Sequence, residues 1–257
     1  MRIDGKRVAV VMPAYNAAKT LADTVGLIPT DVVDHLVLVD DGSRDATVEI
    51  ARGLGLDVVQ HFHNLGYGAN QKTCYTTALQ LEADIVVMLH PDGQYDPRLV
   101  PDLLRPIAEG RADIVLGSRM LHPGGAKAGG MPAWKRVTNR VLTGIENAAL
   151  DAGLSEAHTG YRAYSRDFLE TIPWRRNADG FVFDTQVIFQ ARAFGQRLVE
   201  VPIRTVYETD SSNISLAHSV EYGLSTLGTA ARYAAWRRLR VRSRLFSNPI
   251  GPRDNWS

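Results

Sequence analysis

Five short strand-like segments, most of them apolar runs and each followed by a turn or loop and a helical pattern, constrain the fold of this 257-residue chain more than any other feature. The segments cover residues 8–12, 35–39, 57–60, 85–89 and 113–118. Runs of this length indicate buried strands, and strands that alternate with helices form parallel βαβ units. Right-handed crossovers bring the carboxyl ends of such strands to one edge of the sheet. The pattern predicts an α/β fold with a mostly parallel sheet flanked by helices, and residues 197–202 add a sixth strand.

Polar and turn residues follow these strands at the edge where open α/β sheets bind their ligands. They are Pro13, Ala14 and Tyr15 after the first strand, Asp40 and Asp41 after the second, Gly66, Gly68 and Lys72 after the third, His90, Pro91, Asp92 and Gln94 after the fourth, and Arg119 after the fifth. Each alone has a simpler interpretation as a helix cap, a turn glycine or a solvated lysine. Their common location favours a binding site, because packing of the core does not require them there.

The cluster after the fourth strand has the chemistry of a cation site. Asp92, Gln94 and His90 can hold a divalent ion that neutralises a diphosphate. Either aspartate after the second strand can accept hydrogen bonds from a base or a ribose hydroxyl, and the lysine can reach a phosphate. Neither the dinucleotide glycine fingerprint nor the phosphate-loop Gly-Lys-Ser/Thr motif occurs. We therefore do not expect a Rossmann dehydrogenase or a P-loop kinase.

Charge and composition exclude other classes of protein. Lysine and arginine number 29 against 28 acidic residues, so no net field attracts nucleic acid. The single cysteine, Cys74, excludes an internal disulfide framework and fits a reducing compartment. The first residues lack the apolar region of a signal peptide, and no run of about 18 apolar residues predicts a membrane span. We expect a cytoplasmic protein that contacts a membrane, if at all, only peripherally.

The last part of the chain differs in composition, and we divide the chain into a domain over residues 1–215 and a C-terminal helix and tail over residues 216–257. Basic and apolar residues mix there: Arg232, Arg237, Arg238, Arg240, Arg242 and Arg244 with Trp236, Leu239, Leu245 and Phe246. Such a segment can lie on an anionic membrane surface. A solvated helix end and a contact between copies of the chain in a homo-oligomer are equally compatible interpretations.

Four motifs in combination resemble the family 2 glycosyltransferases with the GT-A fold. They are Val-Val-Met-Pro-Ala-Tyr-Asn at 10–16, Val-Leu-Val-Asp-Asp-Gly-Ser at 37–43, Asn-Leu-Gly-Tyr-Gly at 64–68 and Gly-Ser-Arg at 117–119. The resemblance covers roughly residues 7 to 207 and is closest to the dolichol-phosphate mannosyltransferase and polyprenyl-phosphate glycosyltransferase branch. It implies an inverting transfer of sugar from a UDP- or GDP-sugar, with Mg or Mn on the diphosphate. The implied acceptor is a polyprenyl phosphate or another small or glycan molecule.

The motif after the fourth strand departs from the family pattern. Relatives carry Asp-x-Asp there, whereas this chain has His90-Pro91-Asp92, followed by Gln94 where the polyprenyl branch has a glutamine that helps hold the metal. Neutral imidazole can bind Mn, Co or Zn but is a poor ligand for Mg. We expect Asp92 to be the main metal ligand, with Gln94 beside it. His90 either joins them or hydrogen-bonds a phosphate or the donor sugar.

The resemblance also suggests catalytic residues. Glu156 begins a segment that resembles the family's Asp-x-x-Ser-Gly-Phe-Arg motif, and Asp184 lies where many relatives place a catalytic acid. For a hydroxyl acceptor, Asp184 is the leading candidate for the general base and Glu156 the next. A phosphate acceptor is already anionic and needs mainly positive charge, for example from Arg119. The glycine-containing loop over residues 119–132 is expected to close on the substrate.

Two other functions stay open from the sequence. A non-catalytic module that binds a nucleotide-sugar gains some weight from His90 in place of an acid. A sugar nucleotidyltransferase also uses an α/β sheet and a metal. It should carry a glycine-rich basic loop after the first strand, and residues 13–16 do not form one.

Overall fold

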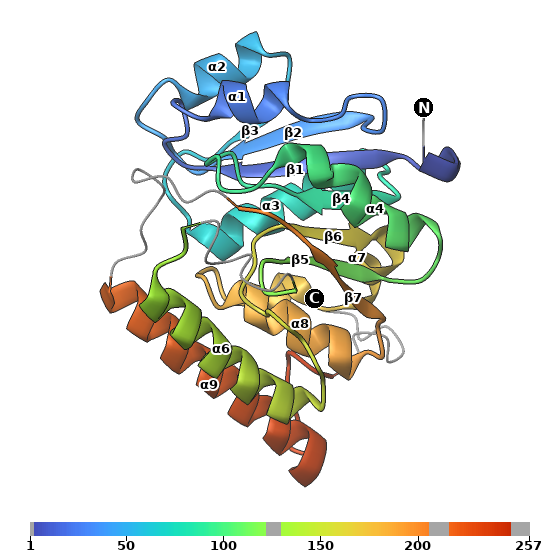
Figure 1. The fold of residues 1–257 in the computed structure, drawn as a ribbon, viewed down its shortest axis with the longest axis vertical. Helices are drawn as coiled ribbons and strands as arrows, with labels where there is room; N and C mark the ends of the chain where they lie inside the picture. Colours follow the sequence, from blue (N-terminus) through green and yellow to red (C-terminus); the bar gives the residue numbers. More distant parts are fainter. Residues whose placement is uncertain (1–2, 122–129, 206–215, 248–257) are drawn as a thin grey trace, which may run out of the picture.

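A computed structural model describes residues 3–121, 130–205 and 216–247, with side chains from residue 221 onward in the last range. Within them, a seven-stranded sheet has the order β3-β2-β1-β4-β6-β5-β7 and carries helices on both faces (Figure 1). The strands are β1 (Val8–Ala14), β2 (His35–Asp40), β3 (Asp57–Gln60), β4 (Ile85–Met88), β5 (Ile114–Ser118), β6 (Arg162–Ser165) and β7 (Leu198–Pro202). The α/β class with a mostly parallel sheet, predicted from the sequence, is confirmed.

Strand β6 is the one antiparallel member of the sheet, and the sequence pattern did not predict it. It pairs with β4 and β5, and its first residue, Arg162, lies opposite both Met88 and Leu116. The other pairings are parallel, so β1 to β5 and β7 end at the same edge, called here the carboxyl edge. Because β6 runs the other way, the residues that precede it, 156–161, also lie at that edge.

Helices cover the sheet in two layers. They are α1 (Leu21–Gly26), α2 (Thr47–Gly53), α3 (Tyr67–Gln80), α4 (Val100–Ala108), α6 (Ala133–Leu150), α7 (Arg166–Thr171), α8 (Phe183–Ala193) and α9 (Leu216–Leu239). Side chains of β1 alternate between the layers: Val10 packs in the core that includes α1, α2 and α4, and Val11 in the core that includes α3, α7 and α8. Such two-sided burial explains why the central strands β1, β4 and β5 are nearly continuous apolar runs.

Helices α6 and α9 lie side by side beyond α8, away from β1 to β3 (Figure 1). Tyr233 of α9 packs on Phe189 with ring centroids 5.2 Å apart, and on Phe246 at 5.3 Å. Leu245 and Phe246 are buried in the core rather than available to a membrane surface. The described C-terminal residues thus join the main core, and a domain boundary at residue 215 stays a prediction. No helix among the described residues is long and apolar enough to cross a membrane.

Candidate functional site

A hollow of about 510 Å³ opens at the carboxyl ends of β1, β2 and β3. Its lining comes from the end of β3 and from the turns that follow the three strands: Tyr15, Gly42, Ser43, Arg44, Gln60, His61, Phe62, His63 and Asn64. Gly42 has a φ of +76°, and a Cβ there would lie 2.9 Å from the carbonyl carbon of His63. The close approach of the second and third turns therefore requires glycine. The ring of Tyr15 is half exposed beside this hollow, whose volume is typical of a small-molecule site.

The two neighbouring aspartates, Asp40 at the end of β2 and Asp41 directly after it, have different surroundings. Asp41 is fully engaged, because Oδ1 accepts a hydrogen bond from Leu65 N at 2.9 Å and lies 2.8 Å from His61 Nδ1, while Oδ2 accepts from Gly66 N at 3.0 Å. Asp40 is buried, and its Oδ2 accepts from Ser43 N at 3.1 Å. Its Oδ1 has no partner among the described residues. Asp40 thus keeps an unused buried acceptor, which is costly unless a ligand satisfies it.

The glycines and the lysine after β3 hold another part of the chain. A Cβ on Gly66 would lie 2.8 Å from Asp179 O, and one on Gly68 would overlap the backbone of residues 178–179. The Lys72 ammonium lies 2.7 Å from Asp179 Oδ1 and donates to the carbonyl oxygen of residue 177. The glycines were expected to allow close approach of a ligand or a neighbouring strand, and the lysine to reach a phosphate. All three contact residues 177–179 in this structure. A role for them in nucleotide binding stays a prediction.

The turn after β4 contains a carboxylate that can accept further hydrogen bonds or bind a cation. Asp92 is partly exposed, and its Oδ1 accepts a hydrogen bond from Gln94 N at 3.0 Å. Its Oδ2 accepts no hydrogen bond from the described residues. Pro91 is buried, and Thr20 Oγ1 donates to its carbonyl oxygen at 2.5 Å. No three His, Cys, Asp or Glu side chains converge in the described part of the chain to form a ready metal site.

His90 is clamped between an aromatic ring and a glycine. Its ring stacks on Tyr67 with centroids 5.5 Å apart, and its Nε2 lies 3.2 Å from the Tyr67 hydroxyl. A Cβ on Gly160 would lie 2.6 Å from the imidazole, so only glycine fits there. Removal from water lowers the pKa of His90, and the nearby carboxylates of Asp92 and Asp184 oppose this shift. The imidazole is therefore predominantly neutral near pH 7.

Asp184 lies in the first turn of α8 and is buried. The Tyr67 hydroxyl donates to its Oδ2 at 2.7 Å, and Gln71 Nε2 donates to its Oδ1 at 3.1 Å. The guanidinium of the fully buried Arg162 lies 3.6 Å from Oδ1. Burial, and then the charge of Asp184, raise the pKa of Tyr67 well above its usual value, so the phenol keeps its proton. Tyr67 therefore connects Asp184 to His90.

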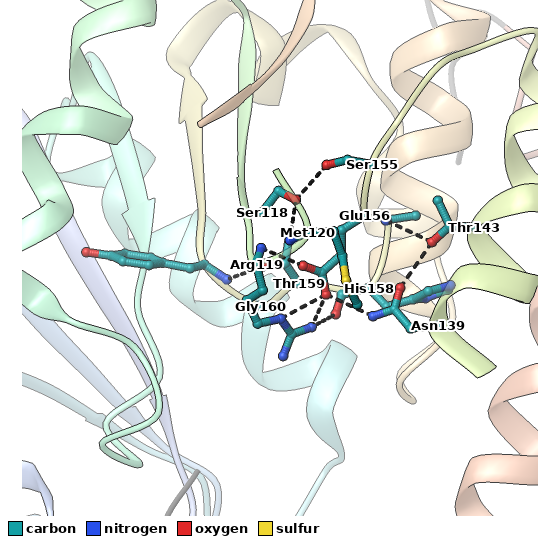
Figure 2. A network of polar contacts seen from close by, with 12 residues as sticks. Ser118, Arg119, Met120, Asn139, Thr143, Ser155, Glu156, His158, Thr159 and Gly160 are labelled. Carbon is teal, nitrogen blue, oxygen red and sulfur yellow. Dashed lines mark hydrogen bonds and ion pairs between the residues drawn. The ribbon is translucent and has the colours of Figure 1, made fainter. Parts of the chain in front are cut away.

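Arg119 and Glu156 form a buried ion pair at the end of β5 (Figure 2). Arg119 N donates to Oε2 at 2.8 Å and its Nε donates to Oε1 at 2.8 Å, while Asn139 Nδ2 donates to Oε1 at 2.8 Å. Arg119 Nη2 also donates to His158 O at 2.7 Å. Glu156 has no exposed surface. Its contacts hold Arg119 in place.

The structure brings predicted residues to the carboxyl edge in three groups. Tyr15 lines the hollow, and Asp40 accepts a hydrogen bond from Ser43 of its lining. His90, Asp92 and Asp184 are associated through the turn after β4 and the Tyr67 hydroxyl, and Arg119 pairs with Glu156 at the end of β5. Sequence reasoning missed Tyr67 as a site residue. Its place inside the 64–68 motif was the available signal. Of the loop expected to close on the substrate, residues 122–129 lie outside the described residues.

Comparisons with known proteins identify the family to which the chain belongs. Residues 9–172 match the sequence profile described as glycosyl transferase family 2. The chain is 30% identical over 246 residues to the undecaprenyl-phosphate mannosyltransferase of Micrococcus luteus, and the alignment covers 92% of this chain and 98% of that protein. It is 27% identical over 243 residues to the UDP-N-acetylglucosamine–dolichyl-phosphate N-acetylglucosaminyltransferase of Methanococcus voltae. That alignment covers 86% of this chain and 96% of the relative.

A solved structure shares the fold. Glucosyl-3-phosphoglycerate synthase from Mycobacterium tuberculosis, in complex with Mn²⁺, UDP and phosphoglyceric acid, superposes with a TM-score of 0.70 and 22% identity. The alignment covers 90% of this chain and 79% of that one.

Proposed function

The chain belongs to glycosyl transferase family 2, and from this premise we propose that it transfers a hexose, with inversion, from a nucleotide-diphosphate sugar to a polyprenyl phosphate. One observation carries the proposal. Three features follow successive strands at a single edge of the sheet: a hollow of nucleoside size, the Asp92 carboxylate, whose Oδ2 accepts no hydrogen bond within the described ranges, and the buried guanidinium of Arg119. This order matches the base, diphosphate and acceptor of such a reaction.

The hollow supports binding of the nucleoside. The half-exposed ring of Tyr15 offers a face for the base. Asp40 Oδ1, which has no hydrogen-bond partner in the described part of the chain, is suited to accept a hydrogen bond from the base or from a ribose hydroxyl. We propose Asp40, rather than the fully engaged Asp41, as the acidic residue that contacts the nucleoside. The relatives' names include a UDP-sugar, and GDP-sugars fit the same features.

The residues after β4 fit a divalent ion held jointly with a diphosphate. Mg²⁺ commonly binds through one or two carboxylates, several waters and substrate phosphates, so a site with the single carboxylate of Asp92 is sufficient. Gln94 would add an amide oxygen. The related synthase was crystallised with Mn²⁺ and UDP. When bound, the ion would neutralise charge on the departing nucleoside diphosphate.

A polyprenyl phosphate needs no general base, because its phosphate oxygen is already anionic. That oxygen would form the new bond to the anomeric carbon as the bond from this carbon to the diphosphate oxygen breaks. Arg119 would supply positive charge to the acceptor, and Glu156 would position Arg119. Asp184 would act as the general base only if the acceptor were a hydroxyl. Its contacts with Tyr67, Gln71 and Arg162 favour a positioning role.

The outer face of α6 fits the surface of an anionic bilayer, where such an acceptor resides. Exposed apolar side chains recur along one side of the helix at helical spacing: Trp134, Val137, Val141 and Ile145. Lys135, Arg136 and Arg140 add positive charge, and the only acid of α6, Glu146, is buried. An apolar stripe flanked by cations binds anionic membrane surfaces. Two copies of this face would repel each other, so we favour a membrane over a homo-oligomer.

The test is a transfer assay with the full chain. Thermal shifts measured with UDP- and GDP-sugars in Mg²⁺ or Mn²⁺ identify the donor, because a ligand of the native state raises its stability. The donor is then incubated with a short-chain polyprenyl phosphate. We expect sugar-linked polyprenyl phosphate and free nucleoside diphosphate. Release of pyrophosphate would indicate a nucleotidyltransferase, and calorimetric binding without transfer to any acceptor would indicate a binding module.

A further inference from the structure

The hydroxyl of Tyr67 contacts two side chains but has a single hydrogen to donate. It lies 2.7 Å from Asp184 Oδ2 and 3.2 Å from His90 Nε2. Asp184 also receives a hydrogen bond from Gln71 and lies 3.6 Å from the Arg162 guanidinium, so its carboxylate acts as an acceptor. The shorter, charge-assisted contact takes the phenolic hydrogen. The oxygen of Tyr67 is then left to accept from His90.

This arrangement assigns the tautomer of His90. At pH 8 an ordinary imidazole is neutral and carries one N–H. Because Tyr67 accepts from Nε2, that hydrogen lies on Nε2, and Nδ1 carries the lone pair. Gly160 closes the other side of the Nε2 edge, which prevents the ring from moving away from Tyr67. Nδ1 makes no hydrogen bond with the described residues. It therefore presents an acceptor. Asp92, two residues later in the chain, offers Oδ2, which accepts no hydrogen bond from the residues that the structure describes.

We propose that Asp184 and Tyr67 hold His90 in the Nε2–H form so that Nδ1 serves, with Asp92, as a ligand of the divalent ion. This rests on the proposed function only in assuming a metal bound with a nucleoside diphosphate. A lone pair cannot donate to a phosphate oxygen, which removes one of the roles that the sequence left open. A site with a nitrogen ligand favours Mn²⁺ over Mg²⁺, since Mg²⁺ prefers hard oxygen.

The tautomer is tested directly by nitrogen-15 NMR of the histidine-labelled full chain at pH 8 without metal. His90→Gln identifies the resonances of His90. We expect the Nε2–H pattern in the natural protein and a mixture of tautomers in Tyr67→Phe, which keeps the ring and removes the hydroxyl. Tyr95→Phe is the matched control, because the Tyr95 ring also lies near His90 but its hydroxyl accepts from Gly160 N instead. An Nδ1–H pattern in the natural protein would overturn the inference.

Metal binding is tested by calorimetry with Mn²⁺ and Mg²⁺ in saturating UDP, and again in GDP. Loss of a group that orients a metal-bound histidine typically weakens binding 10–100-fold, so we expect Tyr67→Phe to weaken Mn²⁺ binding by about tenfold. His90→Asp should shift the preference from Mn²⁺ toward Mg²⁺. If His90→Asp left the ratio of the Mn²⁺ and Mg²⁺ affinities unchanged, the ligand assignment would be wrong. Nδ1 would then be assigned to accept a hydrogen bond from a hydroxyl of the donor instead. Neither readout requires sugar transfer, so failure of the transfer assay alone leaves this inference standing.

Discussion

Glu156 binds Arg119 through both carboxylate oxygens. Oε2 accepts a hydrogen bond from the backbone N–H of Arg119 and Oε1 accepts one from its Nε, each at 2.8 Å. The two residues come from the end of β5 and from the segment that leads into β6. They meet because β6 runs antiparallel between β4 and β5. The pair therefore fixes the start of the segment that follows β5, on the side where we place the acceptor.

Replacement of Glu156 by alanine should lower the free energy of unfolding by about 3–5 kcal/mol, because Arg119 would stay buried without its counter-charge. Urea unfolding measures the loss. Asp113→Ala is the matched control, since it removes an arginine-paired carboxylate whose partner, Arg197, is mostly exposed. Such pairs contribute about 1 kcal/mol or less.

A catalytic base would behave differently at position 156. Glu156→Gln would then leave stability nearly unchanged and reduce kcat by about 10²–10⁴-fold. A positioning residue should instead show a clear loss of stability with a rise in KM for the acceptor. A kcat effect of that size in a Glu156→Gln protein of natural stability would contradict our assignment.

The central strands β1, β4 and β5 and their common edge could be predicted because burial on both faces leaves continuous apolar runs. The partly exposed edge strand β3 covers the predicted residues 57–60, where two valines lie between turn residues. β6 could not, because its four residues include Arg162 and Ser165 and its pairing depends on distant β4 and β5. The polar residues of the site could be identified as a group from their positions after the strands.

The separate roles of those residues could be inferred only from the structure. Asp40 and Asp41 are neighbours of the same type, and only their hydrogen bonds show that Asp41 is fully engaged. Tyr67 and Asp184 are 117 residues apart, so nothing local links them. The catalytic and metal-binding roles of the predicted residues stay predictions that the following experiments address.

Asp92→Ala should abolish metal-dependent nucleotide-sugar turnover, with a loss on the order of 10²-fold or more. The free energy of unfolding should change by no more than about 0.5 kcal/mol, because the described contacts of the carboxylate are confined to its own turn. Turnover and calorimetric Mn²⁺ binding in UDP or GDP measure the effect. Asp96→Asn, an acid in the same turn that pairs with Arg98, is the control and should keep metal-dependent binding. Turnover near the natural rate in Asp92→Ala would refute the metal assignment.

Gly42→Ala should weaken nucleotide binding, whereas the matched change Gly55→Ala should not. Gly42 and Gly55 have nearly equal φ values, +76° and +75°, so alanine incurs a similar conformational penalty of about 1–2 kcal/mol at each. Only at Gly42 does the new Cβ meet backbone, 2.9 Å from His63 carbonyl carbon, so the wall of the hollow must move. We expect UDP or GDP affinity to fall about tenfold in Gly42→Ala, from misplaced contacts, and to be unchanged in Gly55→Ala. Equal affinities in the two variants would argue against the hollow as the nucleoside site.

Val141→Asp should reduce binding to anionic vesicles, because it places a charge in the exposed apolar stripe of α6. Burying a valine contributes about 1.5 kcal/mol, so we expect a loss of about tenfold in flotation with phosphatidylglycerol vesicles. Binding of the natural protein should also fall as salt is raised, because cations flank the stripe. Leu54→Asp is the control, since Leu54 is the exposed C-cap residue of α2, and α2 and α6 lie at opposite ends of the molecule (Figure 1). Equal losses in the two variants, or no binding of the natural protein, would exclude α6 as the membrane-contacting face.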